Sequence, residues 1–164
     1  MSDNPLLQVP GAPEIFWDDL QVGSHWQTRG RTITEPDLVA WLNLTWLTEE
    51  LFTNLADRSG SAIEGRFVPG ALVFSFAEAL TLNAVRIQGL AFLQSTADVK
   101  GPVFVGDTID VHSAVTHLRP TSRADRGLCT TRNVVRNQRG EEVQIYTAMR
   151  MLKRRGAVSP ALSS

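Results

Sequence analysis

The residues best placed to do chemistry lie where a glycine opens the most apolar segment of the chain. Pro69-Gly70 interrupts the chain, and the residues that follow have the apolar density of a helix. The first N–H groups of a helix have no partner within it, and the helix dipole places partial positive charge there. At Gly70 and Ala71 such donors could polarise a carbonyl and stabilise an oxyanion formed from it. Alternatively, Gly70 only lets the helix begin close to a sheet.

A second candidate is a carboxylate within the same segment. Glu78 is costly to bury without a partner. It therefore pairs with an arginine or emerges at a helix face, unless it has a chemical role. Glu78 lies eight residues from Gly70, which is roughly 12 Å along a helix. It could reach a carbonyl held at Gly70 only if a second subunit brought another copy across.

Other polar residues permit two interpretations each. The adjacent acids Glu49 and Glu50 could supply a general base, or they could complement a helix dipole from the surface. Four arginines in expected loops could meet phosphate groups or simply be solvated: Arg66, Arg119, Arg123 and Arg126. Three histidines lie on separate strand-like runs, without the spacing of metal ligands: His25, His112 and His117. No metal site is predicted.

The central helix is expected over residues 70–87. It is apolar nearly all round, with one stripe formed by Leu72, Phe76, Ala79, Leu80 and Leu82. Such a helix belongs in an interior. Polar residues, Glu78 among them, interrupt it before the roughly 18 apolar residues that a membrane span requires. A buried helix requires other elements to cover it.

Strand patterns supply that cover. Four runs follow the helix, at residues 91–100, 107–118, 127–137 and 142–152, and the last turn between them is expected at 137–140. The final run places Val143, Ile145, Thr147, Met149 and Met151 on one face. The order β-α-α-α-β-β-β-β predicts an α+β fold with an antiparallel sheet wrapped around one helix.

The residues before the central helix predict one strand and two helices. The strand is expected over 25–33, and a helix capped by Thr34 should end near Trp46. A short helix over 49–56 would turn Leu51, Phe52 and Leu55 inward.

Length and composition indicate one domain. The chain has 164 residues, with 16 basic and 17 acidic side chains. We expect a single domain over 14–155, an irregular arm over 1–13 and a flexible tail over 156–164. The balanced charge gives no reason to expect nucleic acid. No signal or membrane-spanning segment is seen, so a cytoplasmic location is predicted. The single cysteine, Cys129, excludes an intrachain disulfide framework and is expected to be buried.

Five short segments carry a resemblance to a known family. They are LQVG at 20–23, ITEPDLVA at 33–40, VPGALV at 68–73, GPVFVGDT at 101–108 and NQRGEEV at 137–143. In this order and spacing they resemble the MaoC-like acyl-CoA hydratase/dehydratase family. The resemblance implies a hotdog fold and an acyl-CoA thioester bound at Gly70 and Ala71. Among the loop arginines, Arg66 is taken as a further contact to the substrate. It implies no cofactor other than the coenzyme A of the substrate.

The chain departs from this family at its catalytic motif. Active members resemble one another in a Gly-Asp-x-Asn-Pro-x-His motif after the first helix, which aligns here with residues 46–52. Leu47 stands in place of the aspartate and Phe52 in place of the histidine. Neither side chain can transfer a proton. Hydration of an enoyl thioester by that dyad is therefore not expected unless other groups replace it.

Three functions remain open. The chain could be a lyase of the enoyl-CoA hydratase or 3-hydroxyacyl-CoA dehydratase type with Glu49 or Glu50 as base. It could be a thioesterase that uses Glu78 from a neighbouring subunit. It could also be a non-catalytic thioester-binding subunit that pairs with an active hotdog partner. A single curved sheet leaves edge strands uncovered, so a homodimer or a dimer of dimers is expected.

Overall fold

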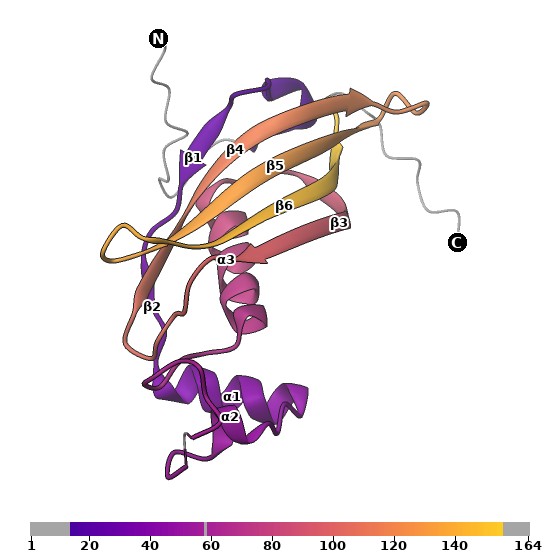
Figure 1. The fold of residues 1–164 in the computed structure, drawn as a ribbon. Coiled ribbons are helices and arrows are strands. Elements are labelled where there is room, and N and C mark those ends of the chain that lie inside the picture. The colour runs from indigo at the N-terminus through magenta and orange to yellow at the C-terminus, as the bar shows by residue number, and fades with distance from the viewer. Residues whose placement is uncertain (1–13, 58, 156–164) are drawn as a thin grey trace.

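A curved antiparallel sheet holds one long helix against its concave face (Figure 1). The computed structural model describes residues 14–57 and 59–155, so the expected arm and tail lie outside the described residues. The sheet has six strands in the order β1-β4-β5-β6-β3, and β2 also pairs with β4. The strands are β1 His25–Gln27, β2 Arg31–Thr32, β3 Gly89–Val99, β4 Thr108–Pro120, β5 Arg126–Asn137 and β6 Glu142–Lys153. The predicted α+β architecture is confirmed.

The helices precede most of the sheet in the chain. They are the short 3₁₀ helix η1 (Trp17–Asp19), α1 (Glu35–Thr45), α2 (Glu50–Thr53) and the central helix α3 (Gly70–Ala84). Helix α1 begins as predicted, because Thr34 and Asp37 cap it reciprocally through side chain and backbone. Helices α1 and α2 lie beyond one end of the sheet (Figure 1). Leu55, which was expected to point inward, is 61% exposed because α2 ends at Thr53.

The first strand is broken in two, contrary to the prediction of one strand over 25–33. Between β1 and β2, the Thr28 hydroxyl accepts a hydrogen bond from the Val111 N–H at 2.9 Å, and the Thr28 N–H donates to the Val111 carbonyl. The segment therefore stays against β4 while it leaves regular strand geometry. The four later strands and the turn at Gly140, where φ is 79°, confirm the sequence pattern.

Helix α3 is covered on one side only. Its buried residues are Leu72, Val73, Ala77, Thr81 and Ala84. The stripe predicted from the sequence is therefore only partly buried, and Leu82 is 55% exposed. The helix also ends at Ala84 and not at residue 87, since Val85 adopts an extended backbone conformation.

The apolar set that the sequence places on one face of β6 is not on its inner face. The side chains that alternate with it are the more buried ones and include Gln144, Tyr146, Ala148, Arg150 and Leu152. The Tyr146 ring packs edge-on against Phe74 of α3, with centroids 5.0 Å apart. Polar groups therefore lie directly beneath the central helix. Cys129 on β5 is buried, as predicted.

Strand β3 forms an open edge of the sheet. It pairs with β6 alone, and all its residues except Ser95 are exposed. Large apolar side chains are among them: Leu90, Phe92, Leu93 and Val99. The pairing with β6 shifts register between Gly89 and Ala91 and again between Phe92 and Gln94, then stays regular to Val99.

Candidate functional site

A hollow of about 310 Å³ lies where α3 begins. Its walls come from the first residues of α3, from residues 99–103 after β3, from β6, and from the segments around Phe52 and Phe67. The lining is mainly apolar. Among the described residues, the only lining side chains with nitrogen or oxygen atoms are Lys100 and Gln144. The hollow therefore suits an apolar group that presents a polar atom to the helix end.

The helix start offers two backbone donors there. The N–H groups of Leu72 and Val73 both bond the Pro69 carbonyl, at 3.0 and 3.2 Å. The N–H groups of Gly70 and Ala71 have no acceptor within the described part of the chain. Gly70 lines the hollow, whereas Ala71 is exposed beside it. This is the arrangement of donors that the sequence predicts, and it can hold a carbonyl oxygen or an oxyanion.

Glycine allows a close approach at the first position of α3. A Cβ atom on Gly70 would lie 2.9 Å from Cγ2 of Val99 on the edge strand. A side chain here would force either the Val99 side chain or the helix start to shift. The close approach of the two elements therefore fixes where the free amides lie.

The two positions aligned with the catalytic dyad differ in their surroundings. Phe52 lines the hollow and packs edge-on against Phe67, with ring centroids 5.4 Å apart. Leu47 packs against the core outside the lining. Trp46, aligned with the glycine of the motif, has φ of 59° and is the only described non-glycine residue with a positive φ. Since glycine favours this backbone conformation, the geometry at Trp46 is consistent with the alignment.

The adjacent acids lie elsewhere. Glu49 and Glu50 are exposed and line a separate surface hollow of about 470 Å³, together with Asp57 and Ser59. They are not among the residues that line the hollow at α3. The structure thus does not bring these carboxylates to the free amides.

Arg66 is held by other groups of the chain. Its Nε and Nη2 atoms bond the Glu35 carboxylate at 2.6–3.2 Å, and its Nη1 atom donates to the Phe52 carbonyl. The hydrogen bond from Arg66 also lowers the pKa of Glu35. Arg66 therefore ties α1 to α2 and does not line the hollow.

Glu78 pairs with an arginine, which is one of the alternatives that the sequence left open. Both of its carboxylate oxygens accept hydrogen bonds from Nη2 of Arg150, at 2.6 and 2.5 Å. The two side chains are only 14% and 10% exposed. Tyr146 lies beside the pair, and burial together with the negative charge of Glu78 raises the Tyr146 pKa. Glu78 is thus part of a nearly buried ion pair between α3 and β6.

The remaining sequence candidates do not gather at the hollow. Arg119, Arg123 and Arg126 lie on or beside the β4–β5 hairpin, at the end of the sheet away from α1 and α2 (Figure 1). Two of them, Arg123 and Arg126, pair with Asp125. Within residues 14–57 and 59–155, no three His, Cys, Asp or Glu side chains are grouped to hold a metal ion.

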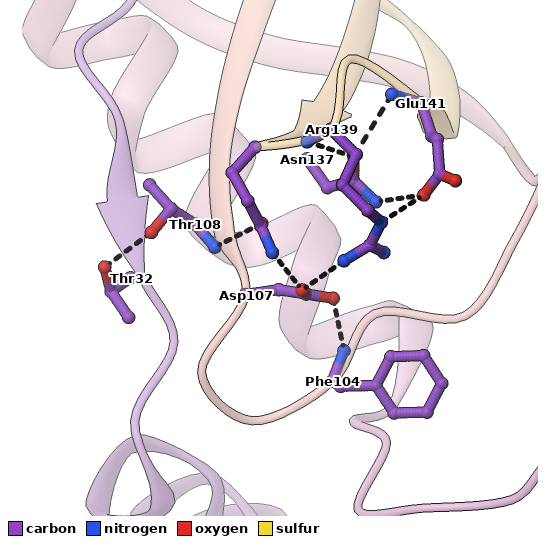
Figure 2. Close-up of polar contacts among 8 residues, drawn as sticks. Thr32, Phe104, Asp107, Thr108, Asn137, Arg139 and Glu141 are labelled. Atoms are coloured by element: carbon purple, nitrogen blue, oxygen red, sulfur yellow. Dashed lines mark hydrogen bonds and ion pairs between the residues drawn. The ribbon is translucent and has the colours of Figure 1, made fainter.

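Sequence reasoning missed a polar network that fixes one wall of the hollow. The buried Asp107 carboxylate accepts hydrogen bonds from the Phe104 N–H at 2.9 Å, Gln138 Nε2 at 2.6 Å and Arg139 Nη1 at 3.2 Å (Figure 2). Burial raises the pKa of Asp107, but these three donors outweigh it and lower the pKa. The sequence signal was the segment GPVFVGDT at 101–108, which contributed only to the resemblance and gave Asp107 no role.

The Asp107 network acts on the hollow through the backbone. It holds the loop before β4, and the Val103 carbonyl of that loop accepts the Val68 N–H at 2.8 Å. Val68 lies two residues before α3. The turn, the loop and the start of the central helix are therefore connected by hydrogen bonds.

Comparison with known proteins identifies the fold. No protein-family model and no curated protein matches the sequence. A putative MaoC domain protein dehydratase from Chloroflexus aurantiacus is similar over 94% of this chain and 45% of that one, with 24% identity and a TM-score of 0.83. The (R)-hydratase of A. caviae involved in PHA biosynthesis matches over 81% and 97%, with 25% identity and a TM-score of 0.68.

A third similar structure is described as a hotdog fold. A Mycobacterium tuberculosis protein with a double hotdog fold matches 90% of this chain and 47% of its own length, with 21% identity and a TM-score of 0.74. The chain therefore has the hotdog fold, and it spans about half of the two longer neighbours. None of the described helices is long and apolar enough to cross a membrane.

Proposed function

We propose that this chain is a member of the MaoC-like hydratase/dehydratase family that binds an acyl-CoA thioester at the start of α3. The observation that carries the proposal is the pair of free N–H groups, at Gly70 and Ala71, beside an apolar hollow. A thioester carbonyl would accept from these amides. The acyl chain would lie against the apolar lining, which includes Val73, Val99 and Val143. Coenzyme A would enter only as part of the ligand.

We further propose that the hydratase dyad is degenerate. Phe52 lines the hollow at the position aligned with the histidine, and no carboxylate or histidine from residues 14–57 or 59–155 lines it. Hydration requires a group that activates water. The geometry therefore favours a thioester-binding subunit over a lyase that uses Glu49 or Glu50. A thioesterase based on Glu78 is less favoured, because Arg150 already pairs with that carboxylate.

The proposed assembly is a homodimer or a dimer of dimers. The open edge of β3 and the exposed flank of α3, with Ala71, Ala79 and Leu82, lie on surfaces that the chain itself does not cover. A second copy would cover both and remove the unpaired strand edge. Sedimentation equilibrium tests this directly, and a monomeric mass at micromolar concentration would contradict it.

Calorimetric titration with butyryl-CoA tests the binding proposal. A saturated acyl chain cannot be hydrated, so hydration contributes no heat to the titration. Butyryl-CoA should bind more tightly than free coenzyme A, because free coenzyme A lacks both the thioester carbonyl for Gly70 and Ala71 and the acyl chain for the apolar lining. Equal affinity for the two compounds, or no binding of either, would refute the proposed site.

Crotonyl-CoA tests the degenerate dyad, by the loss of its enoyl absorbance. The unmodified protein should not hydrate it. The double variant Leu47→Asp, Phe52→His should gain activity, since general acid–base groups typically contribute about 10²–10⁴-fold. The single variant Leu47→Asp is the matched control, because it supplies an acid without the imidazole. Hydration by the unmodified protein would show that other groups replace the dyad.

Release of free thiol from butyryl-CoA tests the thioesterase alternative. We expect no release from the unmodified protein, because the Glu78 carboxylate is held by Arg150. Release that disappears in Glu78→Gln and persists in Glu50→Gln would instead establish that alternative.

A further inference from the structure

Gln144 contacts the first residue of the central helix. It lies on the inner face of β6, is 3% exposed and lines the hollow. Its Nε2 atom donates to the Gly70 carbonyl at 3.3 Å. Its Oε1 atom is buried and has no hydrogen-bond donor among the described residues. The Gln144 side chain therefore donates one hydrogen bond to the helix start, while its own oxygen has no donor among the described residues.

The contact acts on one of the two free amides. The Gly70 carbonyl and the Ala71 N–H belong to the same peptide unit, which is planar and trans, so they point in opposite directions. Because Gly70 is the first residue of α3, the helix already sets the direction of this unit. The Gln144 amide is a further donor on the same carbonyl oxygen; it withdraws electrons from the unit, and successive hydrogen bonds strengthen one another in this way. Gln144 thus supports the position of this peptide unit and polarises the Ala71 N–H.

Packing alone does not account for a glutamine at this position. Its neighbours in the lining include Val73, Val99 and Val143, which are apolar. A methionine has nearly the same length and would leave no buried oxygen without a partner, a state that lowers stability. Residues that lower the stability of a fold are expected mainly at functional sites.

We infer that Gln144 is a positioning residue for thioester binding, acting through the Gly70–Ala71 peptide. The identity of the ligand depends on the proposed function, whereas the effect of Gln144 on the Ala71 amide should be present without any ligand. The two can therefore be tested separately.

The test compares Gln144→Met with Gln21→Met, which makes the same change at an exposed position in the turn before β1. In the free protein, the Ala71 amide proton should move upfield in Gln144→Met, as seen by NMR. With [1-¹³C]butyryl-CoA, the infrared shift of the carbonyl band to lower frequency should become smaller. The dissociation constant should rise by about fivefold to tenfold, as for one lost hydrogen bond. The unfolding midpoint should stay the same or increase, and Gln21→Met should leave the binding, the carbonyl band and the Ala71 amide unchanged.

Three results would overturn the inference. The first is an unchanged Ala71 amide shift in Gln144→Met. The second is lower stability in Gln144→Met with unchanged affinity and an unchanged carbonyl band, which would make the residue structural. The third is failure of both Gln144→Met and Gln144→Leu to fold. If the unmodified protein bound no butyryl-CoA, the proposed function would fail, and the amide shift alone would decide the role of Gln144.

Discussion

Replacing Trp46 by glycine should stabilise the protein. Trp46 follows α1 with φ of 59° and ψ of 28°, and its N–H bonds the Leu42 carbonyl. This left-handed conformation costs about 1–2 kcal/mol for a residue with a Cβ atom. The side chain is 87% exposed, so its removal sacrifices little buried apolar area.

The expected gain is the difference between two opposing effects. Glycine relieves the strain of about 1–2 kcal/mol, but its greater freedom in the unfolded chain costs about 0.5–1 kcal/mol. The net increase in the free energy of unfolding should be about 0.5–1 kcal/mol. For a chain of this length that corresponds to a rise in Tm of roughly 1–4 °C.

Urea unfolding followed by far-ultraviolet circular dichroism measures this change without relying on tryptophan fluorescence. Trp46→Ala is the matched control, because it removes the same indole and keeps the Cβ atom. If Trp46→Gly were no more stable than Trp46→Ala, the strain argument would be wrong. The correspondence between Trp46 and the glycine of the hydratase motif would then lose its physical support.

Three further predictions concern the hollow, the Asp107 network and the buried thiol. Gly70→Ala should weaken butyryl-CoA binding by about tenfold, because the new Cβ meets Val99 at 2.9 Å; titration of the Gly70→Ala, Val99→Ala double variant should recover most of the affinity. The pKa of Asp107 is lower in the folded than in the unfolded state. The Asp107 carboxylate therefore stabilises the fold fully above its unfolded pKa of about 4, and this stabilisation is lost as the pH falls through its lower folded pKa. Asp107→Asn should therefore flatten the acid loss of stability in urea titrations at successive pH values, and an unchanged slope would contradict this. Burial raises the pKa of Cys129 to about 11, so Ellman's reagent at pH 8 should react on the order of 10²-fold more slowly with the native than with the denatured protein; equal rates would refute the buried thiol.

The long strands could be predicted from the sequence because their signal is local. Alternation along β4, β5 and β6 appears within each run, and the turn at Gly140 marks one of their junctions. The break between β1 and β2 could not be predicted. It depends on a hydrogen bond between Thr28 and Val111, which are 83 residues apart.

The inner face of β6 shows why the site was only partly predicted. The sequence displays Ile145, Met149 and Met151 as an apolar set, but the helix packs on the alternate side chains. Arg150 is acceptable there because Glu78, 72 residues away, neutralises it. That pairing cannot be deduced from either segment alone.

The helix start was predictable, and its supporting groups were not. Pro69-Gly70 identified the free amides, since the rule for helix ends is local. Glu49 and Glu50 looked equally suitable by residue type, yet they line a different hollow. Gln144 had no distinguishing signal, because its role depends on a contact with Gly70 across 74 residues.

The shape of β3 limits how another strand could pair with this edge. Its first half shifts register twice against β6, and such bulges twist an edge away from a straight neighbour. Only the stretch from Gln94 to Val99 runs regularly, and near its end Asp98 and Lys100 lie with their charged atoms 3.6 Å apart. A strand that added to this edge would therefore find only a short regular stretch, with charged side chains at one end.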